Sequence, residues 1–100
     1  MARRPLPRRN RVASLHTAEY ERFVQMLVGK RILADLTQQQ VADALGWSQS
    51  LIAKIEKFER RVDVIELLQL ASVIGFDAVR LVRELRAEMK ERGELTQPYD

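Results

Sequence analysis

The chain has 100 residues, of which 46% are apolar and 31% charged, and its formal net charge is +3. This length and apolar fraction predict a single domain with a modest core. It contains no cysteine and one histidine, which excludes a disulfide framework, a thiolate metal site and an imidazole cluster, so we expect no metal and no cofactor. No apolar run reaches the roughly 20 residues of a membrane span and no secretory signal is present, so we expect a cytoplasmic protein with no membrane partner.

Residues 1–14 are predicted to form a disordered basic arm. Pro5 and Pro7 block a helix there, and no apolar periodicity is present that would bury the segment. Five of the chain's 17 basic residues lie in residues 1–11, which contain no acid, so the rest of the chain has 12 basic against 14 acidic residues. Two roles fit the arm equally well: entry into a narrow DNA minor groove, where the potential is most negative, and solubility alone. Its arginines are Arg3, Arg4, Arg8, Arg9 and Arg11.

Residues 15–92 are predicted to form five helices with short connections, because apolar residues recur at helical spacing and no strand pattern occurs. The first runs from about Thr17 to Ala34. Its predicted inward face consists of Tyr20, Phe23, Val24, Leu27 and Ala34. Thr37 with Gln40 forms a capping box that opens the second helix, and Gly46 ends it. Its predicted inward residues are Val41, Ala42 and Leu45.

The last three helices also have start signals. Ser48 caps the third helix, Asp63 with Glu66 caps the fourth, and Asp77 caps the fifth. Gly75 ends the fourth helix, the fifth reaches about Arg92, and residues 93–100 are predicted to be a frayed tail. The predicted inward residues are Ile52 and Ile55 in the third helix, Val64, Leu67, Leu68, Ala71 and Ile74 in the fourth, and Ala78, Leu81, Val82, Leu85 and Met89 in the fifth.

Residues 37–58 have the pattern of two short helices joined by a tight turn. Such helices cross steeply, so a small residue must occupy the close approach, and Ala42 has that place. If Ile52 and Ile55 point inward, the outer face of the third helix carries polar, small and basic groups. Gln pairs with adenine, Lys donates to guanine, Ser is adaptable, and Ala can touch a thymine methyl. The outer face consists of Gln49, Ser50, Ala53, Lys54 and Lys57.

The segment from Leu36 to Glu56 reads LTQQQVADALGWSQSLIAKIE and resembles the Cro and phage-repressor family of helix-turn-helix regulators, also called the xenobiotic-response-element (XRE) type. The resemblance covers roughly residues 20–82. It implies an all-α, five-helix bundle of the lambda-repressor-like type that binds double-stranded DNA as a dimer. Asp35 and Phe58 stand where the family usually has glycine, and Val62 where proline or leucine is frequent. Because Phe58 lacks the conformational freedom of glycine, the path of the chain after the third helix, and with it the roles of residues 59–61, can differ from those in the family.

The resemblance also implies residue roles. Gln49, Ser50 and Lys54 would reach base edges, to which the outer-face argument adds Ala53. Gln38 would contact phosphate, and the connector after the third helix would meet the DNA backbone. With Gln38, the expected phosphate contacts are Trp47, Ser48, Lys57, Arg60 and Arg61. For Trp47, packing as a surface aromatic is an equally open alternative.

One ion pair follows from helical spacing. Arg31 lies four residues after Leu27 on the apolar face of the first helix, and Glu56 lies four after Ile52 on that of the third. A lone charge at either place would be costly, so we predict that Arg31 and Glu56 pair and join the two helices.

Two hypotheses for function follow. The first is a homodimeric transcriptional regulator, in the sense of a repressor on a partly palindromic operator, acting at the nucleoid. Its dimer interface is expected at Leu81, Leu85 and Met89 of the fifth helix, and the alternative is that this apolar side only completes the core. The second is an antitoxin or adaptor whose main partner is another protein, such as a toxin or co-regulator. No catalytic constellation is recognisable, so we do not expect an enzyme.

Overall fold

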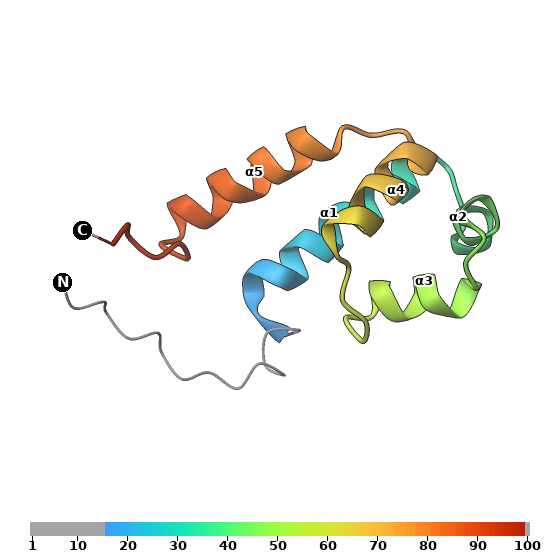
Figure 1. Ribbon diagram of the computed structural model, residues 1–100, viewed down its shortest axis with the longest axis horizontal. Helices are drawn as coiled ribbons and strands as arrows, with labels where there is room; N and C mark the ends of the chain where they lie inside the picture. The colour runs from blue at the N-terminus through green and yellow to red at the C-terminus, as the bar shows by residue number, and fades with distance from the viewer. Residues whose placement is uncertain (1–15, 100) are drawn as a thin grey trace.

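The computed structural model describes residues 16–99, which form five α-helices and, within that range, no β-strand. The helices are α1 (Ala18–Leu33), α2 (Gln38–Leu45), α3 (Gln49–Glu56), α4 (Val64–Ile74) and α5 (Ala78–Glu91). Helices α2, α3 and α4 gather around one end of α1, while α5 runs back along α1 and extends beyond it (Figure 1). The predicted all-α, five-helix fold is confirmed, and the predicted arm with its five arginines lies outside the described residues.

Every helix begins where a side chain caps it. The hydroxyl or carboxylate oxygens of Thr17, Thr37, Ser48, Asp63 and Asp77 accept hydrogen bonds from backbone N–H groups in the first turns of α1 to α5. Both predicted capping boxes are reciprocal: Thr37 N–H donates to Gln40 Oε1 at 2.8 Å, and Asp63 N–H donates to Glu66 Oε1 at 3.0 Å. These bonds satisfy amide groups that have no partner inside the helix, so the helix starts follow from local sequence.

Helices α1 and α3 end in left-handed residues that are not glycine. Asp35 has φ 58° and Phe58 has φ 64°. The N–H of the next residue donates to a carbonyl five residues back, at 3.2 Å after Asp35 and 2.8 Å after Phe58. This is the turn that glycine usually makes at a helix end, so Phe58 adopts the conformation that glycine would have in its place. A side chain in this region costs roughly 1–2 kcal/mol.

Because Asp35 is exposed as well as left-handed, its replacement by glycine should stabilise the fold. We expect Asp35→Gly to raise the free energy of unfolding by about 0.5–1 kcal/mol, since relief of the left-handed strain exceeds the entropy that glycine adds to the unfolded chain. The matched control is Ala34→Gly, because Ala34 is exposed with right-handed φ −81° and should lose about 0.5–1 kcal/mol. Urea unfolding followed by circular dichroism measures both, and equal destabilisation would contradict the prediction.

The core lies between all five helices. Val41 and Ala42 of α2 are 0% exposed, and Ile52 and Ile55 of α3 are buried as predicted, each 3% exposed. The buried cluster consists of Met26, Leu27, Val41, Ala42, Ile52, Leu67, Leu70, Ala71, Ala78 and Leu81. This core holds the α2–turn–α3 unit against α1 and α4.

Several predicted inward residues face solvent. Val64 is 70% exposed, Leu68 49% and Val82 46%, and Ala34 is also exposed, so these four predictions are wrong. In α4 the core takes Leu70 beside Leu67 and Ala71. All but three of the 11 residues of α4 are apolar, so periodicity alone does not say which side faces the core.

The structure bears on one of the three residues predicted to form dimer contacts along α5. Leu81 is 1% exposed and belongs to the core of its own chain, so it is not free to contact a second copy. Leu85 and Met89 are half-buried and line one hollow with Phe23 of α1. Arg22 of α1 donates to both carboxylate oxygens of Glu88, at 2.8 and 3.1 Å. This side of α5 therefore faces α1.

Candidate nucleic-acid interface

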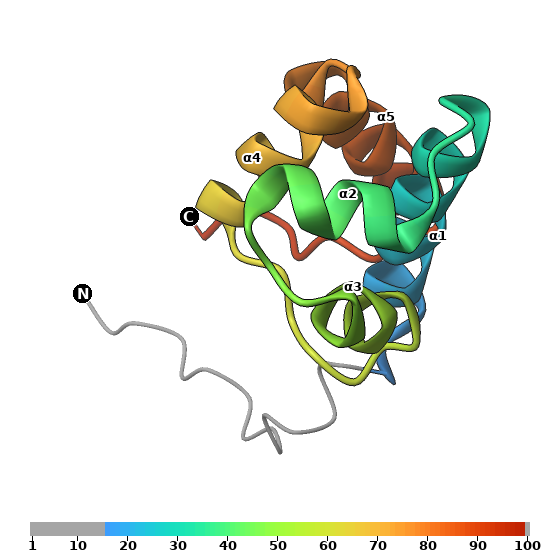
Figure 2. The same ribbon diagram turned by 90° about the vertical axis from the view of Figure 1, so that its right-hand side faces the viewer.

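Helices α2 and α3 form a helix–turn–helix unit. Gly46 ends α2 in the left-handed conformation, with φ 71°, and Trp47 N–H then donates to the carbonyl oxygen of Ala42 at 2.9 Å. In Figure 2 α2 is seen from the side while α3 is seen nearly end-on, so the two axes cross steeply. Ala42 is fully buried at this junction, as the spacing requires.

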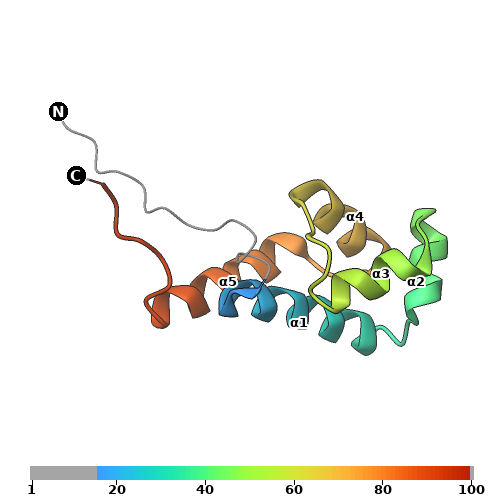
Figure 3. The same ribbon diagram turned by 90° about the horizontal axis from the view of Figure 1, so that it is seen from below.

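The outward side of α3 is open. Viewed from below, α3 lies on the near surface of the molecule (Figure 3). Ser50, Lys54 and Lys57 are exposed, and Gln49 and Ala53 are half-buried. All five residues of the predicted outer face are thus at least partly accessible, and the three exposed ones lie away from Ile52 and Ile55. A helix presented in this way fits the DNA major groove.

A chain of hydrogen bonds connects the core to the first residue of α3. Arg31 of α1 donates to both oxygens of Glu56, through Nε at 2.7 Å and Nη2 at 2.8 Å, and its Nη1 donates to the carbonyl oxygen of Leu36 at 2.9 Å. Gln38 Nε2 donates to Glu56 Oε1 at 2.8 Å, and Gln49 Nε2 donates to Gln38 Oε1 at 2.7 Å. The predicted Arg31–Glu56 pair is therefore present, and it extends to the two glutamines.

This network is largely shielded from solvent. The side chains of Arg31 and Glu56 are 15% and 14% exposed. The hydrogen bonds from Arg31 to the Glu56 carboxylate raise the pKa of Arg31, so the guanidinium stays charged. Gln38 and Gln49 stand at the first positions of α2 and α3, and the bond between them orients the Gln49 amide.

The cations of α3 differ from most of the described arginines. Arg22, Arg31, Arg60, Arg80 and Arg92 each form an ion pair with a glutamate. Lys54 and Lys57 are exposed, and within residues 16–99 neither has a carboxylate at ion-pair distance. Their charge is therefore available to an anionic partner in front of α3.

The connector between α3 and α4, residues 57–63, is held by contacts with α4 and with α1. Arg60 Nη1 donates to Glu66 Oε1 at 2.6 Å, and this bond raises the pKa of Arg60 and lowers that of Glu66. The Arg61 guanidinium lies over the Tyr20 ring, 4.9 Å from its centroid, and Val62 N–H donates to Tyr20 Oη at 3.1 Å. Arg60 is thus engaged with an acid, and the exposed Arg61 stacks on an aromatic ring.

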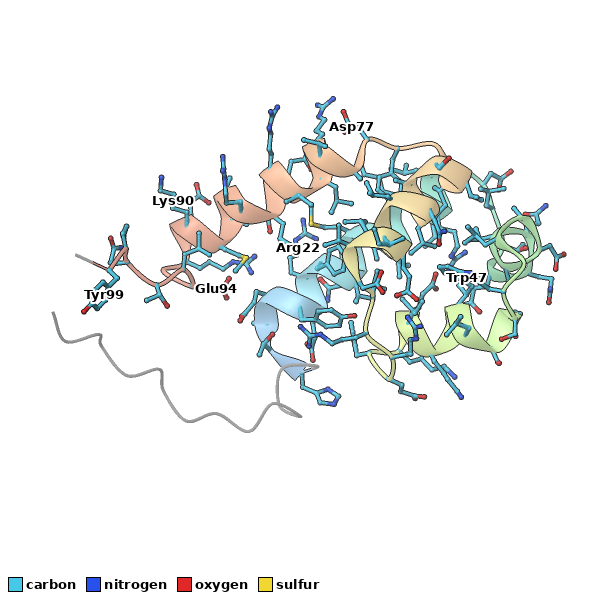
Figure 4. All side chains as sticks on the ribbon, in the orientation of Figure 1. Arg22, Trp47, Asp77, Lys90, Glu94 and Tyr99 are labelled. Carbon is cyan, nitrogen blue, oxygen red and sulfur yellow. The ribbon has the colours of Figure 1, made fainter. Side chains whose placement is uncertain are left out.

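Trp47 and Ser48 both have structural contacts. Trp47 is half-buried against the core and points into the space between α2, α3 and α4 (Figure 4). Ser48 Oγ accepts from Leu51 N at 3.2 Å and lies 3.2 Å from Ser50 Oγ. Sequence reasoning missed the Gln38–Gln49 bond and the role of Tyr20. The Gln38–Gln49 bond could have been found, because the two glutamines occupy equivalent positions at the starts of adjacent helices. No local signal pointed to the contact of Tyr20 with the connector.

Comparisons with known proteins agree with this geometry. A helix-turn-helix family model (HTH_3) matches residues 30–81, which include α2, the turn, α3 and α4, so fold and site define a helix-turn-helix protein. Among solved structures, the XRE-family like protein from Pseudomonas syringae pv. tomato str. DC3000 is 36% identical, with a TM-score of 0.71 over 80% of this chain and 98% of that chain. The chain therefore belongs to the XRE family of helix-turn-helix, DNA-binding regulators. A comparison with curated proteins gave no match.

No helix within residues 16–99 is both long and apolar enough to cross a membrane. No group of three or more histidine, aspartate or glutamate side chains in the same range is arranged to hold a metal ion.

Proposed function

We propose that the protein is a sequence-specific transcriptional regulator, in the sense of a repressor, that inserts α3 into the major groove of double-stranded DNA. The observation that carries this proposal is the braced Gln49 at the start of an open helix, followed by Lys54 and Lys57 without ion pairs among the described residues. Occupation of an operator at the nucleoid would exclude RNA polymerase from the promoter. The proposal requires neither a metal nor a cofactor.

The proposed contacts divide into two groups. Gln49, Ser50, Ala53 and Lys54 would read base edges, because they share the outer side of α3. The second group would contact phosphates and set the position on the duplex: Gln38, Trp47, Ser48, Lys57, Arg60 and Arg61. Within this group Lys57 is exposed and has no ion pair among residues 16–99, whereas Arg60 is bound to Glu66.

We further propose that the protein binds as a homodimer to a partly palindromic operator. One α3 reaches only a few base pairs, and two-fold pairing doubles the site while spacing the recognition helices by about one turn of DNA, roughly 34 Å. Selection from random duplexes at physiological salt tests both points. We expect an inverted repeat with half-sites about 10 base pairs apart to be enriched. No enrichment over random DNA would contradict the proposal.

The basic arm provides a separate prediction. Deleting residues 1–11 removes five arginines, and we expect weaker binding to operator and random DNA alike, with a smaller dependence on salt. Each phosphate that the shortened chain no longer neutralises should reduce the slope of log K against log salt by about 0.9. Titrations at several salt concentrations measure this slope, with Lys57→Gln as the reference for removal of a single cation. An unchanged slope would leave the arm without a role in DNA binding.

One observation favours a second function, that of an adaptor or antitoxin. Arg83, Arg86 and Lys90 are exposed along one side of α5 and have no ion pair within residues 16–99. Lys90 points away from α1 (Figure 4). Such a row fits an acidic surface of a partner protein. Two results together would favour this function. The wild-type chain would show no preference for an operator, and a stoichiometric protein partner would bind it but not the variant R83Q/R86Q/K90Q.

A further inference from the structure

Helix α4 carries apolar side chains that its own chain does not use. Val64 is 70% exposed, Ile65 63% and Leu68 49%, and together they form a continuous exposed arc beside the buried Leu67 and Ala71 of α4. We refer to Val64, Ile65 and Leu68 as the α4 patch. Single exposed aliphatic residues are ordinary, but three on adjacent positions of one helix face indicate a surface that something covers.

Within α4 the one acid, Glu66, is half-buried and paired with Arg60, and the exposed Asp63 precedes the helix as its cap. Gln69 and Ser72 are exposed and continue the same side of α4, so its exposed arc is aliphatic at the start and neutral and polar beyond. In a two-fold pair the same surface meets itself, and a patch is compatible with a copy of itself only if it brings no like charges together. The α4 patch meets this condition.

Two other exposed apolar surfaces fit a second copy less well. On α5, Val79 and Val82 are flanked by Arg83 and Arg86, and a two-fold contact there would bring cations together. Ile32, at the end of α1, lines a hollow with Gln38 and Gln49, on the side where DNA is proposed to lie.

From these observations we infer that a second copy of this chain covers the α4 patch; the inference rests on the homodimer of the proposed function. The position of the patch relative to α3 is set by the connector, because Tyr20 holds Val62 and Glu66 holds Arg60. Pairing across α4 would thus place two recognition helices at one fixed separation.

The size of the patch determines how strong this pairing is. Three side chains amount to a few hundred Å² at most, below the roughly 1,200 Å² of a standard stable interface. The pair therefore forms weakly in free solution and is completed on the operator, where DNA holds both copies. Binding to the full operator is then cooperative, whereas binding to a single half-site is not.

The absence of cysteine permits a direct test of proximity. Leu68→Cys and Ile65→Cys are prepared in the full chain, with Val79→Cys as the matched control at 58% exposure on α5. At high protein concentration without DNA, mild oxidation is expected to yield disulfide-linked dimers from the two α4 variants at about ten times the control rate. Equal rates in all three variants would overturn the inference. Because this readout needs no DNA, it remains valid if the proposed operator binding fails.

A second measurement uses the selected operator and its half-site. Leu68→Glu is expected to leave half-site affinity within about twofold and to weaken binding of the second copy by about tenfold, a usual size for coupling between two binding events. Val79→Glu should change neither. Retained cooperativity in Leu68→Glu, with its melting temperature unchanged, would overturn the inference while leaving specific DNA binding intact. Absence of wild-type preference for either DNA would instead contradict the proposed function.

Discussion

Replacing Arg31 with alanine is expected to lower the free energy of unfolding by about 3 kcal/mol, among the largest effects of any single substitution in this chain. The substitution leaves the Glu56 carboxylate, which is 14% exposed, without the cation that neutralises it. Removing one partner of a shielded pair costs about 3–5 kcal/mol, and we take the lower end because the pair retains some contact with water. Leu36 also loses the donor to its carbonyl oxygen.

The control for this prediction is Arg22→Ala. Arg22 also donates two hydrogen bonds to a single carboxylate, that of Glu88, but its side chain is 38% exposed, so we expect a much smaller change in melting temperature. Chemical unfolding of the two variants beside wild type measures the difference. Similar melting curves for all three proteins would show that the Arg31–Glu56 pair does not clamp α3 to α1.

Replacing Gln49 with alanine is expected to cost about 1–3 kcal/mol of operator binding and to relax the preference at one base pair of each half-site. Gln49 stands at the start of α3, and Gln38 orients its amide from behind. Gln38→Ala should therefore relax the preference at the same base pair although Gln49 is present. Fluorescence anisotropy with operators changed at single base pairs measures both effects.

Lys54→Ala should have a comparable cost at a different base pair, since Lys54 lies more than one helical turn further along α3. The control is Gln25→Ala, because Gln25 is exposed on α1 outside the proposed interface. Preserved base preference in Gln49→Ala and Lys54→Ala would contradict direct readout by α3, even if overall affinity fell.

The two predictions are linked through one network. Arg31 holds Glu56, Glu56 holds Gln38, and Gln38 holds Gln49, so the bonds that join α3 to the core also orient its first residue. A site held by such bonds loses less conformational entropy when it meets a base edge. We therefore expect Arg31→Ala to weaken operator binding as well as folding.

Much of this arrangement was predictable because its signals are local. Thr37, Ser48 and Asp63 cap helices by bonding to amide groups within three residues, so a short window of sequence contains both partners. The outer face of α3 was predictable for a related reason, since Ile52 and Ile55 establish its inner side. The Arg31–Glu56 pair spans 25 residues but was deducible because two charges lay on apolar faces.

Other features depend on packing between distant segments. The sequence of α4 is apolar nearly all round, and only contact with the rest of the core left Val64 and Leu68 exposed. Likewise, α5 packs on α1 in a way that buries Leu81, and Tyr20 reaches Val62 across 42 residues of sequence. No local pattern specifies which of several apolar stripes is buried, because that choice minimises exposed area over the whole chain.

The sequence by itself thus determined where the helices begin, which side of α3 is free, and the family. Tertiary structure alone decided that Gln49 is braced by Gln38 and which apolar side chains remain for a partner. The physical reason is range: caps and helical faces are set within a few residues, whereas burial and side-chain networks are set by segments that meet only in the folded chain.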